Sequence, residues 1–88
     1  METAFKCILC GRVFKNISWL SRHFKWSHYD RYKCPICGMR VKDVVLHCCK
    51  LIEACPKHAV AYYLLTDKRA NKKLRRKALE HVYALCLI

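Results

Sequence analysis

Residues 5–28 read FKCILCGRVFKNISWLSRHFKWSH, with a pair of cysteines near one end and a pair of histidines at the other. The spacing is C-x2-C-x12-H-x4-H, formed by Cys7, Cys10, His23 and His28. Two thiols on one short turn and two imidazoles about one helical turn apart converge on one point, as tetrahedral zinc requires. The stretch therefore predicts a metal-organised unit at the amino-terminal end.

Three apolar residues stand at regular places around these ligands. Phe5 lies two before the first cysteine, Phe14 four after the second, and Leu20 three before the first histidine. With them, the stretch resembles the two-cysteine, two-histidine (CCHH) zinc-finger family across residues 5–28 without a gap. The resemblance implies a two-stranded hairpin packed on one helix. Zinc would then supply folding free energy that so small a core lacks.

The composition agrees with a metal-supported fold. The chain has 88 residues, eight cysteines and a formal charge of +12, and chains of this size usually supplement a small core with metals or disulfides. The beginning, METAFKC, lacks the apolar stretch of a signal peptide, so we expect a reducing, intracellular compartment with thiolates on metal. No apolar run approaches the length of a bilayer span, so we expect no membrane partner. The expected fold class is a small metal-stabilised α+β protein.

A second cysteine pair opens the stretch YKCPICG, residues 32–38. Cys34 and Cys37 are followed by His47 in the spacing C-x2-C-x9-H, which is three residues shorter than in the first finger. We expect the missing residues to come from the passage between the second strand and the helix. The first finger carries its base-facing residues there, so this module is not expected to read bases.

The fourth ligand of the second site stays open between Cys55 and His58. Cys48 and Cys49 lie too close to the histidine ligand to share its face of a helix. Cys55 and His58 become reachable if the helix breaks before Pro56, which itself suits the start of a new helix. We expect two zinc ions in total. At least two of Cys48, Cys49 and Cys55 are expected to be small buried hydrophobes.

Three units follow from these patterns: a finger over 3–28, a degenerate zinc module with its following helix over 32–65, and a basic, then amphipathic, helix over 66–88. The join between the metal modules is short, which should hold them together as one compact unit. In the last helix an apolar stripe, more often core than interface, leaves a homodimer as a second option. The stripe consists of Leu74, Ala78, Val82 and Leu85.

The third unit begins with a dense basic cluster. Such a run is expected to bind phosphate backbones without regard to sequence, although a solubilising face or a targeting signal is the plainer alternative. The cluster consists of Lys68, Arg69, Lys72, Lys73, Arg75, Arg76 and Lys77.

The finger resemblance also implies which residues would face bases. They are Asn16, Trp19 and Arg22, with Ser18 beside them, and Lys15 and Lys25 would contact phosphates. Arg22 suits guanine and Asn16 suits adenine. Trp19 fits that pattern poorly, because an indole is better suited to stacking on an exposed base or to a protein contact.

Two functions remain on these grounds. The first is a DNA-binding transcriptional regulator; the alternative is an adaptor that engages RNA or protein through the finger and the apolar last helix. A zinc held by four protein ligands has no open position for a substrate, so we do not expect an enzyme.

A lone intact finger before a degenerate one, in a small basic chain, also resembles finger proteins from viruses and plasmids of hyperthermophilic archaea. That resemblance implies regulation of viral or host genes in a host cytoplasm, whereas a eukaryotic source would imply the nucleus.

Overall fold

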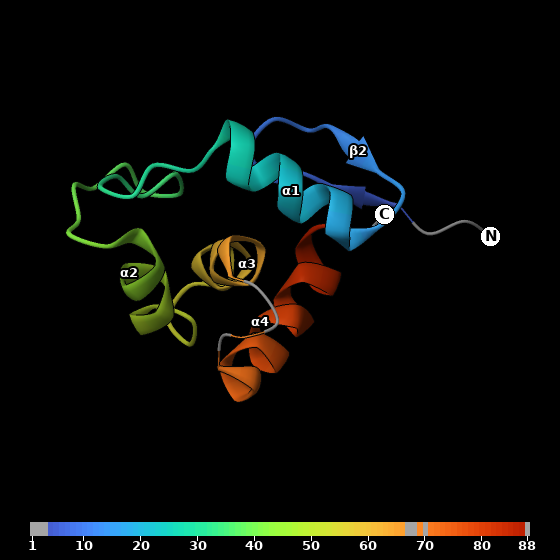
Figure 1. The fold of residues 1–88 in the computed structure, drawn as a ribbon. Helices are drawn as coiled ribbons and strands as arrows, with labels where there is room; N and C mark the ends of the chain where they lie inside the picture. The colour runs from blue at the N-terminus through green and yellow to red at the C-terminus, as the bar shows by residue number, and fades with distance from the viewer. Residues whose placement is uncertain (1–3, 67–68, 70, 88) are drawn as a thin grey trace.

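The computed structural model describes residues 4–66, 69 and 71–87. Its elements are β1 (Phe5–Lys6), β2 (Val13–Phe14), α1 (Ile17–Ser27), α2 (Val44–Lys50), α3 (Pro56–Leu65) and α4 (Lys72–Leu85). Helix α3 lies in the middle, and α1, α2 and α4 each pack against it (Figure 1). The predicted class is confirmed: a hairpin and helix, a shortened second module, and further helices make a small α+β fold.

The first unit is a hairpin followed by a helix. Strands β1 and β2 are antiparallel, with Phe5 opposite Phe14. Helix α1 begins directly after Asn16, whose side-chain oxygen accepts a hydrogen bond from the backbone N–H of Trp19 at 3.0 Å. This contact satisfies one of the unpaired donors at a helix start. Helix α1 then buries Leu20 together with its neighbour one turn on, Phe24.

The second module repeats this plan in reduced form. A single antiparallel bridge joins Lys33 to Arg40, at the positions that correspond to Lys6 and Val13 in the first hairpin. Helix α2 is capped by Asp43, whose carboxylate accepts hydrogen bonds from the first turn. The sequence-based expectation of a zinc-finger-like module is met, although the hairpin is shorter.

The second module was expected to lack three residues between its second strand and its helix. The structure places this deletion elsewhere. Helix α1 begins seven positions after the second cysteine of its pair, and so does α2 (10 to 17 and 37 to 44). His23 is the seventh residue of α1, whereas His47 is the fourth residue of α2. The passage from strand to helix is therefore unchanged, and the deletion removes about one turn from within the helix.

Helix α3 connects the three units, because almost every side chain it carries is buried, as in a core helix. Its first turn lies beside α2, because His58 groups with His47, and its last turn lies beside α1. The hydroxyl of Ser21 on α1 donates to the backbone carbonyl of Leu64 at 2.7 Å. The two metal modules are thus held together through α3.

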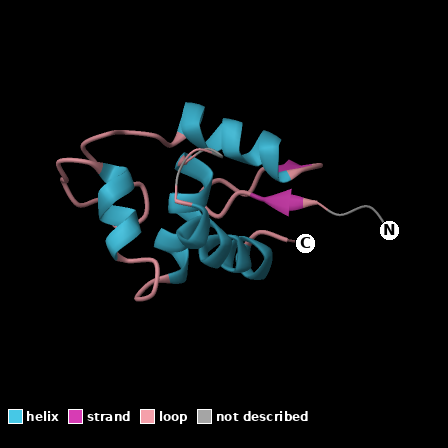
Figure 2. Ribbon diagram, turned by 60° about the horizontal axis from the view of Figure 1, so that its bottom comes forward, coloured by secondary structure: helices cyan, strands magenta, loops and turns pink. Residues whose placement is uncertain are grey.

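Helix α4 runs along α3 and ends beside the first strand (Figure 2). Its apolar stripe packs inside the chain, with Ala78 and Val82 fully buried, while Leu85 is exposed. Since the stripe is largely used internally, the described residues give no support to a homodimer through this helix. No described helix combines the length and apolar character that a membrane span needs.

Candidate zinc centres and nucleic-acid interface

The first cluster of metal-binding side chains sits between the hairpin and α1. Cys7, Cys10, His23 and His28 each offer one atom, and these atoms lie within 4.8 Å of one another. The Cys10 Sγ atom is 3.2 Å from His23 Nε2. Ligands on a tetrahedral zinc are about 3.3–3.8 Å apart, given metal–ligand bonds of roughly 2.0–2.3 Å. The cluster has the ligand types and the compactness of a structural zinc site.

The histidines of this cluster are oriented for metal binding. His23 Nε2 faces the thiols, and its Nδ1 lies 3.4 Å from the hydroxyl of Ser27. With zinc on Nε2, the Nδ1–H would donate to that hydroxyl and fix the ring. His28 Nε2 is buried and has no hydrogen-bond partner among the described residues. Because buried polar atoms are nearly always paired, a metal is the fitting partner for this nitrogen.

The second cluster joins Cys34, Cys37, His47 and His58, again with one atom each within 4.8 Å. Cys37 Sγ lies 3.5 Å from His47 Nε2. Both ring nitrogens of His58 are buried without a hydrogen-bond partner among the described residues. This is expected of a histidine whose natural partner is a metal ion. Of the two candidates for the fourth ligand, the structure places His58 in the cluster. Cys55 is the residue before α3 and lies outside the cluster.

The fourth ligand comes from the next helix for a geometric reason. Because His47 lies one turn earlier in its helix than His23, and α2 ends at Lys50, the short helix offers no second histidine. Pro56 begins α3, which places His58 in the first turn of that helix. The second zinc site therefore joins α2 to the central helix, whereas the first lies within a single finger.

Each cysteine pair closes on a glycine. Gly11 and Gly38 directly follow the second cysteine and have φ of +79° and +74°. The N–H of Gly11 donates to the carbonyl of Cys7 at 3.0 Å, and that of Gly38 to Cys34 at 2.8 Å. Only glycine adopts this left-handed conformation without steric cost. The same turn thus presents two thiols in both modules.

Burial shifts the pKa values of three of the ligands, Cys7, His28 and His58. Burial raises the pKa of Cys7, although backbone hydrogen bonds from Leu9 and Cys10 partly oppose that change. Burial lowers the pKa of His28 and of His58, and a neighbouring histidine lowers each further. Neutral imidazole and a protonated thiol are therefore favoured, so zinc binding would release thiol protons.

The other cysteines are placed as packing residues. Cys48 and Cys86 are fully buried, and burial raises the pKa of Cys48 to about 12 and that of Cys86 to about 11. Both therefore stay protonated at neutral pH and act as small apolar side chains. Cys49 and Cys55 are half-buried, so Cys48 alone of these three is fully buried, whereas at least two were expected to be.

The helix start fixes the register of the expected base-facing residues. Because α1 begins at Ile17, Asn16 directly precedes the helix, and Trp19 and Arg22 are its third and sixth residues. These three and Ser18 are exposed, as are Lys15 and Lys25. The side-chain oxygen of Asn16, however, already accepts the hydrogen bond that caps the helix. A two-point contact with adenine needs that same oxygen.

A hollow of about 300 Å³ lies where α1 meets α3 and α4. Arg22 and Lys25 line it from the finger helix, and Arg75 lines it from α4. The Arg75 Nε–H donates to the Thr66 hydroxyl at 3.2 Å, and the guanidinium lies 4.4 Å from the ring centre of Tyr63. We call this site the basic hollow, defined by Arg22, Lys25 and Arg75.

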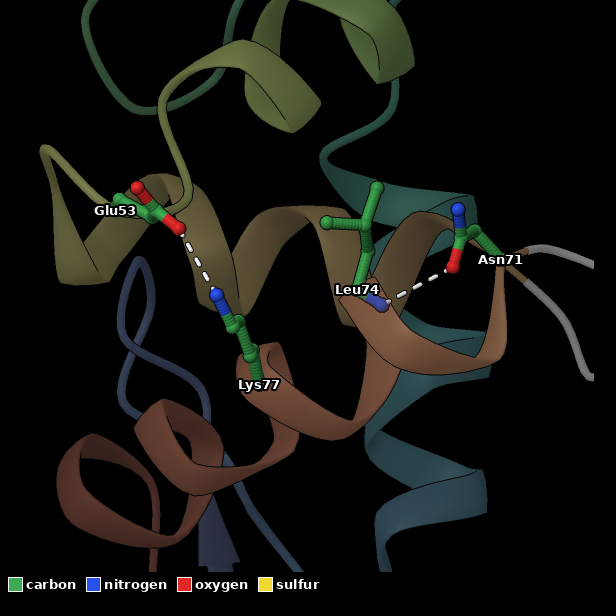
Figure 3. Close-up of polar contacts among 4 residues, drawn as sticks. All are labelled: Glu53, Asn71, Leu74 and Lys77. Atoms are coloured by element: carbon green, nitrogen blue, oxygen red, sulfur yellow. Dashed lines mark hydrogen bonds and ion pairs between the residues drawn. The ribbon is translucent and has the colours of Figure 1, made fainter.

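Four more cations of the predicted basic cluster lie on α4. Lys72, Lys73 and Arg76 are exposed and line a separate hollow on the surface of α4. Lys77 forms an ion pair with Glu53 at 2.9 Å (Figure 3). Arg69 is exposed, and Lys68 lies outside the described residues.

Helix α4 is capped by Asn71, the residue directly before it. The side-chain oxygen of Asn71 accepts a hydrogen bond from the N–H of Leu74 (Figure 3) and another from the N–H of Lys73. The cap fixes the start of the helix and therefore the side on which its cations stand.

The sequence analysis missed Trp26, which at 82% exposed is the most exposed large apolar residue among those that the structure describes. It lies seven positions after Trp19 on the same helix, and this spacing returns a side chain to nearly the same face. The seven-residue interval could have predicted that the two indoles share one face of the helix. The roles of Thr66 and Tyr63 in holding Arg75 depend on tertiary packing and had no comparable signal.

Comparison with known proteins agrees with this geometry. The family model "Zinc finger, C2H2 type" matches residues 5–28, which are the hairpin, α1 and the first cluster. Residues 5–28 are therefore a C2H2-type zinc finger, a class that binds nucleic acids or proteins. The two clusters are consistent with two Zn²⁺ ions. No curated protein and no solved structure matches the chain.

Proposed function

We propose that this chain is a nucleic-acid-binding protein that holds the phosphate backbone in the basic hollow. One observation carries the proposal: Arg22 and Lys25 line the same hollow as Arg75, although Arg75 is far from them in the sequence. Tyr63 and Thr66 hold the Arg75 guanidinium in place. A preorganised guanidinium beside two exposed cations suits phosphate oxygens, which accept charge-assisted hydrogen bonds.

The cations of α4 add to this attraction. Helix α4 has no acidic residue in its first turn, where Lys72 and Lys73 stand. Positive side chains at a helix start oppose the helix dipole at a cost of about 0.3–1 kcal/mol each. A bound phosphate would offset that repulsion. With a net charge of +12, the chain as a whole favours a polyanionic partner.

Transcriptional regulation at DNA is the role we propose for this binding. Arg22 is the residue best placed for base readout, because it is exposed at the sixth position of α1. Both zinc ions are proposed to be structural, and no catalytic role is proposed, because each cluster supplies four protein ligands. The second candidate is an RNA- or protein-binding adaptor, which is favoured by the exposure of Trp19 and Trp26.

The test is a salt titration of nucleic-acid affinity. The double variant Lys25→Gln, Lys73→Gln removes one cation from the basic hollow and one from α4. Its control, Lys42→Gln, Lys50→Gln, removes two exposed cations from the second module. On duplex DNA, we expect the slope of log Kd against log salt concentration to fall by about 0.9 for each phosphate that is no longer neutralised, and only in the first variant. If the slope of log Kd against log salt concentration is the same in both variants, the phosphates do not bind at the basic hollow and α4.

A further inference from the structure

A second hollow, of about 310 Å³, lies on the face of α1 nearest the first zinc cluster. We call it the aromatic hollow; it is lined by Phe14, Trp19, Arg22, His23, Trp26 and Ser27. Trp19 is 56% exposed and Trp26 is 82% exposed. Two large indoles on one helix face leave much apolar surface in water, and such surface commonly marks a binding site.

The two hollows are neighbours because Arg22 lines both. Its guanidinium lies 5.8 Å from the centre of the Trp19 ring, within the range of a cation–π contact. A flat apolar surface thus lies next to a site for phosphate. A nucleotide has the same two parts, since a planar base is attached to a charged backbone.

The chemistry of the indoles favours an unpaired base over a base pair. In duplex DNA the base faces are covered by stacking, and a protein reaches only the edges in the grooves. An indole has one donor and no acceptor, so it distinguishes base edges poorly. It does stack well on an open base face, and such contacts dominate recognition of single strands.

We infer that the aromatic hollow binds an unpaired base of single-stranded nucleic acid, with the adjoining phosphate in the basic hollow. This inference rests on the proposed function and names its substrate class. Charge complementarity supports the occupant: the described residues that line the two hollows include Arg22, Lys25 and Arg75 but no carboxylate. An acidic peptide is the competing occupant.

Intrinsic fluorescence provides a direct test, because Trp19 and Trp26 are the two tryptophans of the whole chain. The zinc-loaded protein is titrated with single-stranded DNA of about 12 nucleotides, which is within the usual site size. RNA of the same sequence and the matching duplex are titrated in parallel. We expect both single strands to quench the tryptophan emission, and the duplex to quench it much less.

Variants identify the residue responsible. Trp26→Leu removes the more exposed indole, and Tyr32→Leu is the control, because it removes another aromatic residue, 60% exposed, from the second module. Circular dichroism and zinc content show that both variants remain folded. We expect Trp26→Leu to weaken single-strand binding roughly fivefold or more and to leave duplex binding unchanged. The loss of single-strand affinity in Trp26→Leu should be larger than any loss in Tyr32→Leu.

The remaining outcomes separate the inference from the function beneath it. Single-strand binding without quenching, with equal affinities for the two variants, would overturn the inference and leave nucleic-acid binding intact. Failure of the wild-type chain to bind any of the three probes would overturn both. Stronger quenching by an acidic peptide of equal charge than by the single strands would assign the hollow to a protein partner and overturn the inference.

Discussion

The backbone N–H of Lys6 donates a hydrogen bond to the carbonyl of Cys86 over 2.7 Å. Phe5 and Leu87 form an antiparallel bridge beside it, so the end of the chain pairs with the free edge of β1. The first finger is therefore fixed to the last helix as well as to α3. This attachment holds α1 and α4 in the arrangement that creates the basic hollow.

A chain that ends at Leu85 should have a loosened finger even though it keeps all eight ligands. The truncation removes the acceptor for Lys6 and the buried side chain of Cys86. We expect the free energy of unfolding to fall by about 2–3 kcal/mol. Denaturant unfolding measures this decrease, and hydrogen exchange at the Lys6 amide locates it. A chain that ends at Leu87 is the control, and equal stability of the two chains would show that the pairing contributes nothing.

Substitutions of Asn16 should separate its two possible roles. Asn16→Ala removes the helix cap and should cost about 1 kcal/mol of stability, whereas Asn16→Ser keeps a capping oxygen and should cost little. Both lack the side-chain amide that would contact adenine. If the residue acts as a cap, the serine variant keeps wild-type DNA affinity in a binding titration. A loss of affinity with full stability would instead indicate base contact.

The metal ligands of the first finger could be predicted from sequence because they form a local pattern. Periodicity and spacing fix Cys7, Cys10, His23 and His28 within one hairpin and one helix, and the structure brings all four together. The helix that begins at Pro56 was likewise predicted from a local feature, the proline itself. Such features depend on neighbouring residues in the chain.

The errors and open choices concern contacts between distant elements. The sequence could not choose between Cys55 and His58, because the choice depends on how α3 leaves α2. It also placed the deletion in the second module before the helix, although His47 shows that a turn is missing within it. The pairing of Lys6 with Cys86 has no sequence signal, since it follows from how α4 packs on α3.

The two turn glycines should respond alike to substitution. A Cβ at position 38 would meet no atom within 4 Å, and one at position 11 would make an ordinary 3.5 Å contact with the Lys6 side chain. Only the left-handed backbone opposes alanine, so Gly11→Ala and Gly38→Ala should each cost about 1–2 kcal/mol. Gly38→Asn should recover part of the loss, because asparagine tolerates this conformation. Thermal unfolding tests the series; an undiminished stability in both alanine variants would contradict it.

Acid should release the metal and unfold the chain together. The pKa values of His28 and His58 lie below the usual 6.5 in the folded chain. Folding therefore favours their neutral forms, and the stability they contribute is present above pH 6.5 and is lost as pH falls through the lowered values. Bound zinc lowers those values further. Zinc release measured with a coloured chelator should parallel the circular dichroism change below pH 6.5; release centred above that pH would be inconsistent with these sites.

Native mass spectrometry tests the central claim, that two zinc ions hold this fold and that the second is bound by a residue from α3. The wild-type chain and Cys55→Ala should each carry two zinc ions, whereas His58→Ala should carry one tightly bound ion. A single zinc on the wild-type chain, or two on His58→Ala and one on Cys55→Ala, would contradict the account.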